Sequence, residues 1–427
     1  MRLPILLLLG CALGACDRVP IELPDATLTA ESPNLGEVQL DPSVSLRLVP
    51  DNARGTVTLA VRGEPVAFDP ADGAFTYDVT LDQGLNTFPF TLTDEDGEAR
   101  ADTFYAVHLP LARTTEAEGA TARVGAASSP SGESRLVSGG LGDDGGPLAT
   151  ASQVTLADDV ISETEISLHT PRAFHTATAL DGGVLLVGGA VRDLALDPTD
   201  FVTEVEWVRD DGTIASVAVD TEIRRSGHGA RLLTHDGQAV LYLMGGRTPR
   251  SAASATADVF QVLREPDGTP RLERLSPDSG VSGFATIAGL AFQTVGERRA
   301  LGFGVASGEG VAVRSVWFLP GTPYYPFSLR TVEVPPLTTP RIDAATADLG
   351  GGLVLVVGGR DAVGTPLGSM EVYADAPGLA FRVPESVRLA VPRSGATATI
   401  FDGRRIVVSG GRPASGSATA RYEVFRY

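Results

Sequence analysis

The sequence predicts an all-β chain in which a small N-terminal β-sandwich precedes a six-bladed β-propeller. A unit of two short strands around a tight turn, ending in a pair of glycines, recurs through the last three quarters of the chain. Further apolar strands follow these units, and four strands at such a period describe one propeller blade. Before the first unit, about 90 residues alternate apolar and polar side chains between turn residues, a pattern typical of a β-sandwich.

The clearest copy of the repeat is TPRAFHTATALDGGVLLVGGA, from Thr170 to Ala190. Its first strand is apolar and threonine-rich, and Asp181-Gly182-Gly183 forms a turn that tolerates positive φ. Its second strand, Val184 to Val187, is apolar on both faces, which suits a strand buried between two sheets. The other copies share an arginine, a small-residue strand, a turn, an apolar strand and a glycine pair: Arg225 to Arg247, Arg341 to Arg360, Arg393 to Arg412 and, more weakly, Gly119 to Gly140.

The spacing of the glycine pairs indicates an array of six repeats. The second glycines are Gly140, Gly189, Gly246, Gly359 and Gly411, with gaps of 49, 57, 113 and 52 residues. Because the gap of 113 is about twice the others, a degenerate copy is expected near its middle. Phe284 to Phe292, followed by Gly302-Phe303-Gly304, occupies that place.

A third apolar strand follows each glycine pair, and a fourth follows in five repeats. The third strands are Ser152 to Leu156, Thr203 to Val208, Ala257 to Val262, Arg314 to Leu319, Ser369 to Ala374 and Arg421 to Phe425. The glycine pair with its downstream valine and aromatic residue resembles the kelch motif, over about residues 111–427. Kelch propellers include both enzymes and binding proteins, so the resemblance implies a fold and leaves the function open.

The last repeat stops at Tyr427 without a fourth strand, so ring closure requires a strand from the front of the propeller. The segment His108 to Arg113 lies at the right distance before the first repeat. We expect it to complete the sixth blade, because pairing the first segment with the last removes an open sheet edge.

The N-terminus has the pattern of an export signal. Residues 1–15 contain one positive charge and an apolar run too short to span a bilayer, which takes roughly 18 residues. Leu13-Gly14-Ala15-Cys16 resembles the bacterial lipobox, which implies that Cys16 is lipidated and that residues 16–23 form a tether. The alternative is ordinary signal cleavage nearby. Either way the sequence predicts export to the bacterial cell envelope.

Residues 24–110 are expected to form the sandwich, with strands over residues 45–50, 56–63, 75–81, 86–98 and 102–109. The stretch Leu81 to Ala99 is similar to the end of bacterial immunoglobulin-like or cadherin-like modules, which implies a spacing or adhesive role. Asp94, Glu95 and Asp96 could ligate calcium, the one cofactor considered, because hard cations take several oxygens. The interpretation we favour is a hairpin turn.

Composition excludes several classes of function. The chain has 53 acidic and 34 basic residues, all of the latter arginine, so nucleic acid and anionic headgroups are disfavoured partners. Its two cysteines, Cys11 and Cys16, both lie in the N-terminal segment. The propeller therefore has no thiol for a disulfide, a thiolate metal site or the cysteine-linked tyrosine of kelch copper-radical oxidases. No sialidase aspartate box, G-x-S-x-G elbow, phosphate-binding glycine loop or H-E-x-x-H pair occurs in the sequence.

One arginine begins the innermost strand in four of the six repeats. These candidates are Arg172, Arg225, Arg341 and Arg393. Because equivalent positions in successive blades form a ring, they could surround the channel mouth and attract an anion such as a sugar acid. The alternative, which we favour, is that each arginine braces its blades through carbonyls or carboxylates.

Histidines follow two of these arginines three residues later, at His175 and His228. They could share a metal or act as acid and base. The equivalent positions elsewhere include Ala344 and Ala396, and no third metal ligand is evident, so structural histidines are the favoured interpretation. No catalytic residue and no metal ligand is assigned.

Together these features predict a membrane-anchored envelope lipoprotein whose propeller binds a protein or glycan ligand. The loops Ala190 to Phe201 and Arg247 to Thr256 would then carry contacts. The alternative is a sugar-acid-processing enzyme of the kelch mutarotase type, with His175 or His228 at the wall of its pocket. A third hypothesis is a purely architectural envelope component.

Overall fold

The computed structural model describes residues 27–52, 55–131, 133–193, 197–235, 237–251, 256–279, 287–295, 299–306, 310–322 and 325–427. The predicted signal peptide, Cys16 and the tether lie outside these residues. The chain forms two compact units that interleave along the sequence. The first comprises residues 27–33, Ser45–Asp78 and Phe88–Phe104, and the second comprises Asn34–Val44, Val79–Thr87 and Tyr105–Tyr427. Within the described ranges, no helix has the length and apolar character needed to cross a bilayer.

The first unit is built on two four-stranded sheets, as the alternation of its sequence predicts. One sheet has the order β1 (Thr27–Ser32), β2 (Ser43–Asp51), β6 (Ala74–Thr80), β5 (Phe68–Asp69). The other has the order β4 (Glu64–Val66), β3 (Thr58–Val61), β7 (Gly84–Thr93), β8 (Ala99–His108). Along β7, Phe88, Phe90 and Leu92 are buried while the residues between them are exposed, so this strand has one core face.

The acidic turn of this unit uses one of its carboxylates to close the chain reversal. Oδ1 of Asp94 accepts hydrogen bonds from the backbone N–H groups of Asp96 and Glu98, at 3.1 and 2.9 Å. Glu95 and Asp96 are exposed. Across the residues described, no group of three or more histidine, cysteine or acidic side chains is placed to hold a metal ion.

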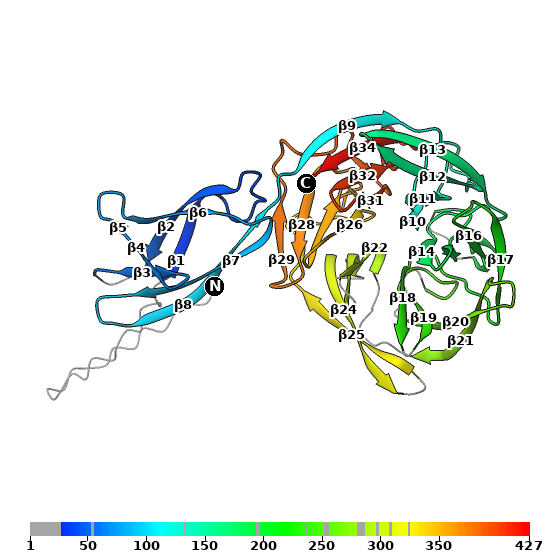
Figure 1. Ribbon diagram of the computed structural model, residues 1–427, viewed down its shortest axis with the longest axis horizontal. Helices are drawn as coiled ribbons and strands as arrows, with labels where there is room; N and C mark the ends of the chain where they lie inside the picture. The colour runs from blue at the N-terminus through cyan, green and yellow to red at the C-terminus, as the bar shows by residue number, and fades with distance from the viewer. Residues whose placement is uncertain are drawn as a thin grey trace, which may run out of the picture. The chain divides into compact units, whose positions relative to one another are not determined.

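The second unit contains a propeller of six four-stranded blades, counted over the described residues (Figure 1). Blades 1 to 3 are β10 (Ala127–Ser131), β11 (Ser134–Ser138), β12 (Thr150–Ala157), β13 (Val160–Ser167); β14 (Thr176–Leu180), β15 (Gly183–Val187), β16 (Val205–Arg209), β17 (Ile214–Val219); and β18 (Gly229–His235), β19 (Gln238–Met244), β20 (Ala257–Arg264), β21 (Pro270–Ser279). Blades 4 and 5 are β22 (Ile287–Val295), β23 (Arg299–Ala306), β24 (Gly310–Thr322), β25 (Tyr325–Val334); and β26 (Ala345–Gly350), β27 (Leu353–Val357), β28 (Met370–Ala374), β29 (Leu379–Arg382). Blade 6 has the order β31 (Thr397–Phe401), β32 (Arg405–Ser409), β34 (Arg421–Arg426), β9 (Ala112–Glu118).

The first strand of each blade contacts the first strand of the next, and β10 contacts β31, so these strands line a closed ring. Two features depart from a repetition of six equivalent, separate blades. The outer strands β17 and β21 pair briefly in parallel, which joins blades 2 and 3 into one sheet. In the degenerate fourth blade, Gly302 and Gly304 lie inside β23, opposite Arg314 and Ala312, and do not end the strand as the glycine pairs of the other blades do.

The strand that closes the ring is β9, which pairs with β34 so that Glu118 lies opposite Arg421. Closure by a segment before the first repeat is therefore correct, but the segment begins four residues later than the predicted His108 to Arg113. Pro110 lacks the N–H that a sheet ladder needs. Leu109 and Leu111 on either side of it are instead buried against the core of blades 5 and 6.

The glycine pairs of the repeat form the joints between blades. Gly188 and Gly189 have φ values of 66° and 102°. The N–H of Gly189 donates to the carbonyl of Arg225 in the next blade at 2.8 Å, and a Cβ on Gly188 would lie only 2.5 Å from that oxygen. Only glycine satisfies both conditions, because a side chain would be strained by φ and would also collide with the neighbouring backbone. The pairs at residues 139–140, 358–359 and 410–411 make the same contact with the next blade's arginine.

Candidate binding site at the mouth of the propeller channel

The four arginines predicted as a ligand ring lie inside the blades. Arg172, Arg225, Arg341 and Arg393 are at most 2% exposed. Each pairs with a carboxylate on the third strand of its own blade: Arg172 with Glu206 at 2.6 Å, Arg225 with Asp258 at 2.8 Å, Arg341 with Glu371 at 2.8 Å and Arg393 with Glu423 at 2.5 Å. A guanidinium enclosed in this way cannot receive a ligand, so the ligand-ring hypothesis is corrected. The geometry is that of the bracing alternative.

In blades 2, 5 and 6 the carboxylate of the pair also accepts hydrogen bonds from the backbone of the segment that leads into the blade. In blade 5, Glu371 accepts from the guanidinium of Arg341, from the N–H groups of Thr338 and Thr339 and from the hydroxyl of Thr338. The guanidinium in turn donates to the carbonyls of Gly358 and Ser369, at 2.9 and 2.8 Å. Burial lowers the pKa of Arg341, and the neighbouring Glu371 charge opposes that shift.

Blade 1 carries a fifth arginine of this class that the sequence interpretation missed. Arg123 is 4% exposed and donates to the carbonyls of Gly139 and Thr150, at 2.9 and 2.8 Å. Ser152 stands where the other blades have their carboxylate and accepts from Arg123 at 3.3 Å. The detectable signal was Arg123-Val124-Gly125, which has the same arginine and glycine spacing as Arg225-Ser226-Gly227 and Arg393-Ser394-Gly395.

The two candidate histidines are buried between neighbouring blades. Nε2 of His175 lies 2.7 Å from the hydroxyl of Ser138 in blade 1, and Nε2 of His228 lies 3.2 Å from the hydroxyl of Thr176 in blade 2. Burial lowers the pKa of His228 to about 3, and it lowers the pKa of His175 well below the usual value. Both imidazoles are therefore neutral at physiological pH.

Two residues after each buried arginine, the backbone adopts a left-handed conformation. These left-handed positions are Gly125, Phe174, Gly227, Asp343 and Gly395, with φ between 53° and 66°. Their backbone groups bond from blade to blade: Gly395 to Asp343, Gly125 to Gly395, Phe174 to Gly125 and Gly227 to Phe174, at 2.7–2.9 Å. They form the rim of the channel across blades 5, 6, 1, 2 and 3. At Phe174 and Asp343 the rim holds residues for which this conformation is strained.

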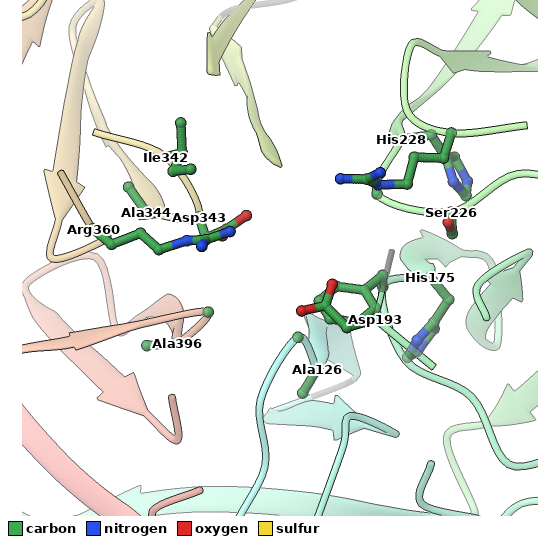
Figure 2. Close-up of a pocket in the computed structure, with 15 residues that line it drawn as sticks. Ala126, His175, Asp193, Ser226, His228, Ile342, Asp343, Ala344, Arg360 and Ala396 are labelled. Carbon is green, nitrogen blue, oxygen red and sulfur yellow. The ribbon is translucent and has the colours of Figure 1, made fainter. Parts of the chain in front are cut away.

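The rim encloses a pocket of about 210 Å³, the mouth pocket, whose wall includes Phe174, Asp193, Arg247, Asp343 and Arg360. Figure 2 shows Arg360 and Asp343 on one side of this pocket and Asp193 across from them. The Arg360 guanidinium contacts the Asp343 carboxylate at 2.8 Å, and both side chains are partly exposed. The site thus combines an aromatic ring with charged groups of both signs.

A second hollow of about 470 Å³, the side pocket, shares Phe174, Asp193, Asp343 and Arg360 with the mouth pocket. Its further wall includes Arg412 and Val363, a valine that is 87% exposed. Deeper in the channel, small residues such as Ala126, Ala344 and Ala396 line the space together with His175 and His228. Among the described residues of the predicted contact loops, Asp193 and Arg247 lie in the pocket walls. Residues 194–196 and 252–255 of these loops lie outside the described part of the chain.

The arginines at the mouth are therefore a different set from the predicted one. Arg247, Arg360 and Arg412, the post-glycine arginines, each come directly after a glycine pair. The visible signal was the tripeptide Gly-Gly-Arg, which ends three copies of the repeat.

Comparison with known proteins supports the fold and no further assignment. No protein-family model and no curated protein matches the sequence. The solved structure of YjhT is similar to this chain with a TM-score of 0.52 and 14% identity, covering 71% of this chain and 94% of that one. At this identity the similarity extends to the propeller-like arrangement alone.

Proposed function

We propose that this chain is a lipid-anchored envelope protein whose kelch-type propeller binds a protein or glycan ligand at the mouth of its channel. The lipobox-like sequence before Cys16 supports the anchor, and an immunoglobulin-like spacer fits the sandwich unit. Loops on a rigid scaffold commonly carry binding residues, and the mouth pocket lies where such loops converge.

The observation that carries the proposal is that two of the five left-handed positions on the rim are not glycine. Three left-handed positions are glycine, while Phe174 and Asp343 adopt the same conformation at a cost of roughly 1–2 kcal/mol each. Both side chains line the mouth pocket and the side pocket. Strain retained at two wall positions of one pocket supports a role in binding, because the fold itself is served by glycine there.

The lowered pKa values of the two buried histidines favour a binding function over a catalytic one. With its pKa lowered to about 3, the His228 imidazole is a weak base at neutral pH, and Asp343 is engaged by Arg360. The alternative of a mutarotase-type enzyme rests on the position of His175 and His228 in the wall of the mouth pocket. Mutarotation of a sugar by the purified protein, lost in His175→Gln, would favour that alternative.

Replacing Asp343 with glycine is expected to change ligand binding markedly, because Asp343 lines both pockets and pairs with Arg360, while leaving the protein as stable or up to about 1 kcal/mol more stable. The substitution relieves the left-handed strain, and the partly exposed ion pair that it removes contributes little. The measurement combines thermal unfolding with binding to a glycan and peptide microarray. Asp402→Gly is the matched control, because Asp402 is also left-handed (φ 45°) but lies outside both pockets. Equal binding by both variants would contradict the proposed site.

The anchor has its own test. In bacteria expressing the full chain, an alkyne-labelled fatty acid should be incorporated into the wild-type protein and be absent from Cys16→Ala, which should leave the membrane fraction. Cys11→Ala should remain labelled, because only Cys16 follows the lipobox-like Leu13-Gly14-Ala15 sequence. Labelling of Cys16→Ala, or no labelling of the wild type, would remove the anchor from the proposal.

A further inference from the structure

The post-glycine arginines occupy equivalent places in three blades. Each blade's post-glycine residue pairs with the residue directly after its buried arginine: Arg247 with Ser226, Arg360 with Ile342 and Arg412 with Ser394. Blades 1 and 2 make the same pairing with Leu141 and Ala190. The backbone therefore sets Arg247, Arg360 and Arg412 beside the rim, in blades 3, 5 and 6.

Two of these guanidiniums lack a carboxylate partner among the residues that the structure describes. Arg360 is held by Asp343, whereas no ion pair within the described residues involves Arg247 or Arg412. The Nε atom of Arg412 is buried without a hydrogen-bond partner in the same set. In a chain with a formal charge of −19, most arginines at such half-buried places would be expected to find a carboxylate.

The charges around the two pockets leave a small positive excess. Three arginines face two carboxylates, those of Asp193 and Asp343. A singly charged group fits this balance better than a phosphate, which the two carboxylates would repel more strongly. The planar guanidinium donates two parallel hydrogen bonds to a carboxylate, so the residue type also suits this ligand group.

We propose that Arg247, Arg360 and Arg412 hold a carboxylate of an anionic ligand, with the Phe174 ring as the apolar wall against which its uncharged part packs. This inference rests on the proposed function and names the chemistry of its ligand. Together the mouth pocket and the side pocket offer space for a sugar acid of one or two rings or for two or three residues of an acidic peptide. Both sources present the same carboxylate chemistry.

The test uses the full-length protein in detergent and four probes in two arms. One arm compares a galacturonate dimer with a neutral galactose dimer, and the other compares a glutamate-rich peptide with its glutamine counterpart. Binding is measured by calorimetry at 50 and 300 mM salt, because a charge-based site weakens as salt rises. The test variant is Arg247→Gln, Arg412→Gln, and the control is Arg388→Gln, Arg404→Gln, which removes two exposed arginines and the same net charge.

We expect one acidic probe to bind, its neutral counterpart to bind at least 30-fold more weakly, and the test variant to lose about the same factor. The control should stay within about 2-fold of wild type. The arm in which binding occurs identifies the source of the carboxylate.

Three results would overturn the inference: equal binding of neutral and acidic probes, equal loss in the control, or no binding of either acidic probe. Thermal unfolding of each variant ensures that lost binding is not lost folding. Another result would refute only the carboxylate assignment and leave the mouth as the binding site. In that case Asp343→Gly changes the binding of an array ligand, whereas Arg247→Gln, Arg412→Gln does not. Array binding that Asp343→Gly leaves unchanged, neither weaker nor stronger, would refute the proposed site itself.

Discussion

Glu371→Gln is expected to lower the free energy of unfolding by about 3–5 kcal/mol, a large fraction of the stability of an ordinary domain. The substitution keeps the size of the side chain but leaves the guanidinium of Arg341, which is 1% exposed, without its counter-charge. It also weakens the hydrogen bonds from Thr338 and Thr339, which depend on a negative acceptor. Urea unfolding followed by circular dichroism measures the loss.

A double-mutant cycle separates the ion pair from the rest of the site. Arg341→Met with Glu371→Gln should cost less than the two single changes added together, with a coupling of at least about 2 kcal/mol. The pair between Arg388 and Glu385 is the control, because these side chains are 61% and 75% exposed and should couple by no more than about 0.5 kcal/mol. Similar coupling in the two cycles would refute the bracing role of the buried pairs.

The second large effect is a loss of stability between pH 7 and pH 5. The pKa of His228 is lowered to about 3 in the folded chain, whereas an unfolded histidine titrates near 6.5. Between these values the unfolded state binds a proton that the folded state does not, so stability falls as pH drops below about 6.5. At pH 5 the contribution of His228 is about 2 kcal/mol, and His175, whose pKa is lowered for the same reason, adds to it.

The comparison of unfolding at pH 7 and pH 5 in variants assigns this effect. His228→Gln can retain a hydrogen bond to Thr176 and should lose about 2 kcal/mol of the pH dependence. His169→Gln removes an exposed histidine and should keep all of it. An unchanged pH profile in His228→Gln would show that this imidazole does not remain neutral in the folded protein.

The fold could be predicted from the sequence because the repeated residues are those that the backbone of each blade requires. A glycine pair is needed wherever a strand end meets the carbonyl of the next blade's arginine, and four glycine pairs make this contact within the described residues. The fourth blade lacks the pair and was found only because the spacing left room for it. The start of the closing strand was misplaced because apolar character alone did not separate buried Leu109 and Leu111 from a paired strand.

The site was less accessible because a repeat gives the position of a residue and not the direction of its side chain. The buried arginines and the post-glycine arginines belong to the same repeat and differ in their partners. A carboxylate on the third strand turns Arg341 inward, while Arg360 bonds to Asp343 on the rim. Pairing each arginine with the acidic residues at matching places in its blade would have separated the two sets. The left-handed conformation of Phe174 has no counterpart in the sequence pattern, since glycine occupies that place in blades 1, 3 and 6.

The pairing of β9 with β34 also determines when the propeller ring can close during synthesis of the chain. Glu118 and Arg421 meet across about 300 residues, which a ribosome adds in roughly 15–60 s. During that interval β9 has no partner strand on blade 6, and the hydrogen-bonding edge that β34 later fills stays open. Contacts this distant in sequence form slowly, so the ring should close last, after the individual blades. The molecule is therefore most exposed to proteases and to pairing with other chains in the period just before its final strand arrives.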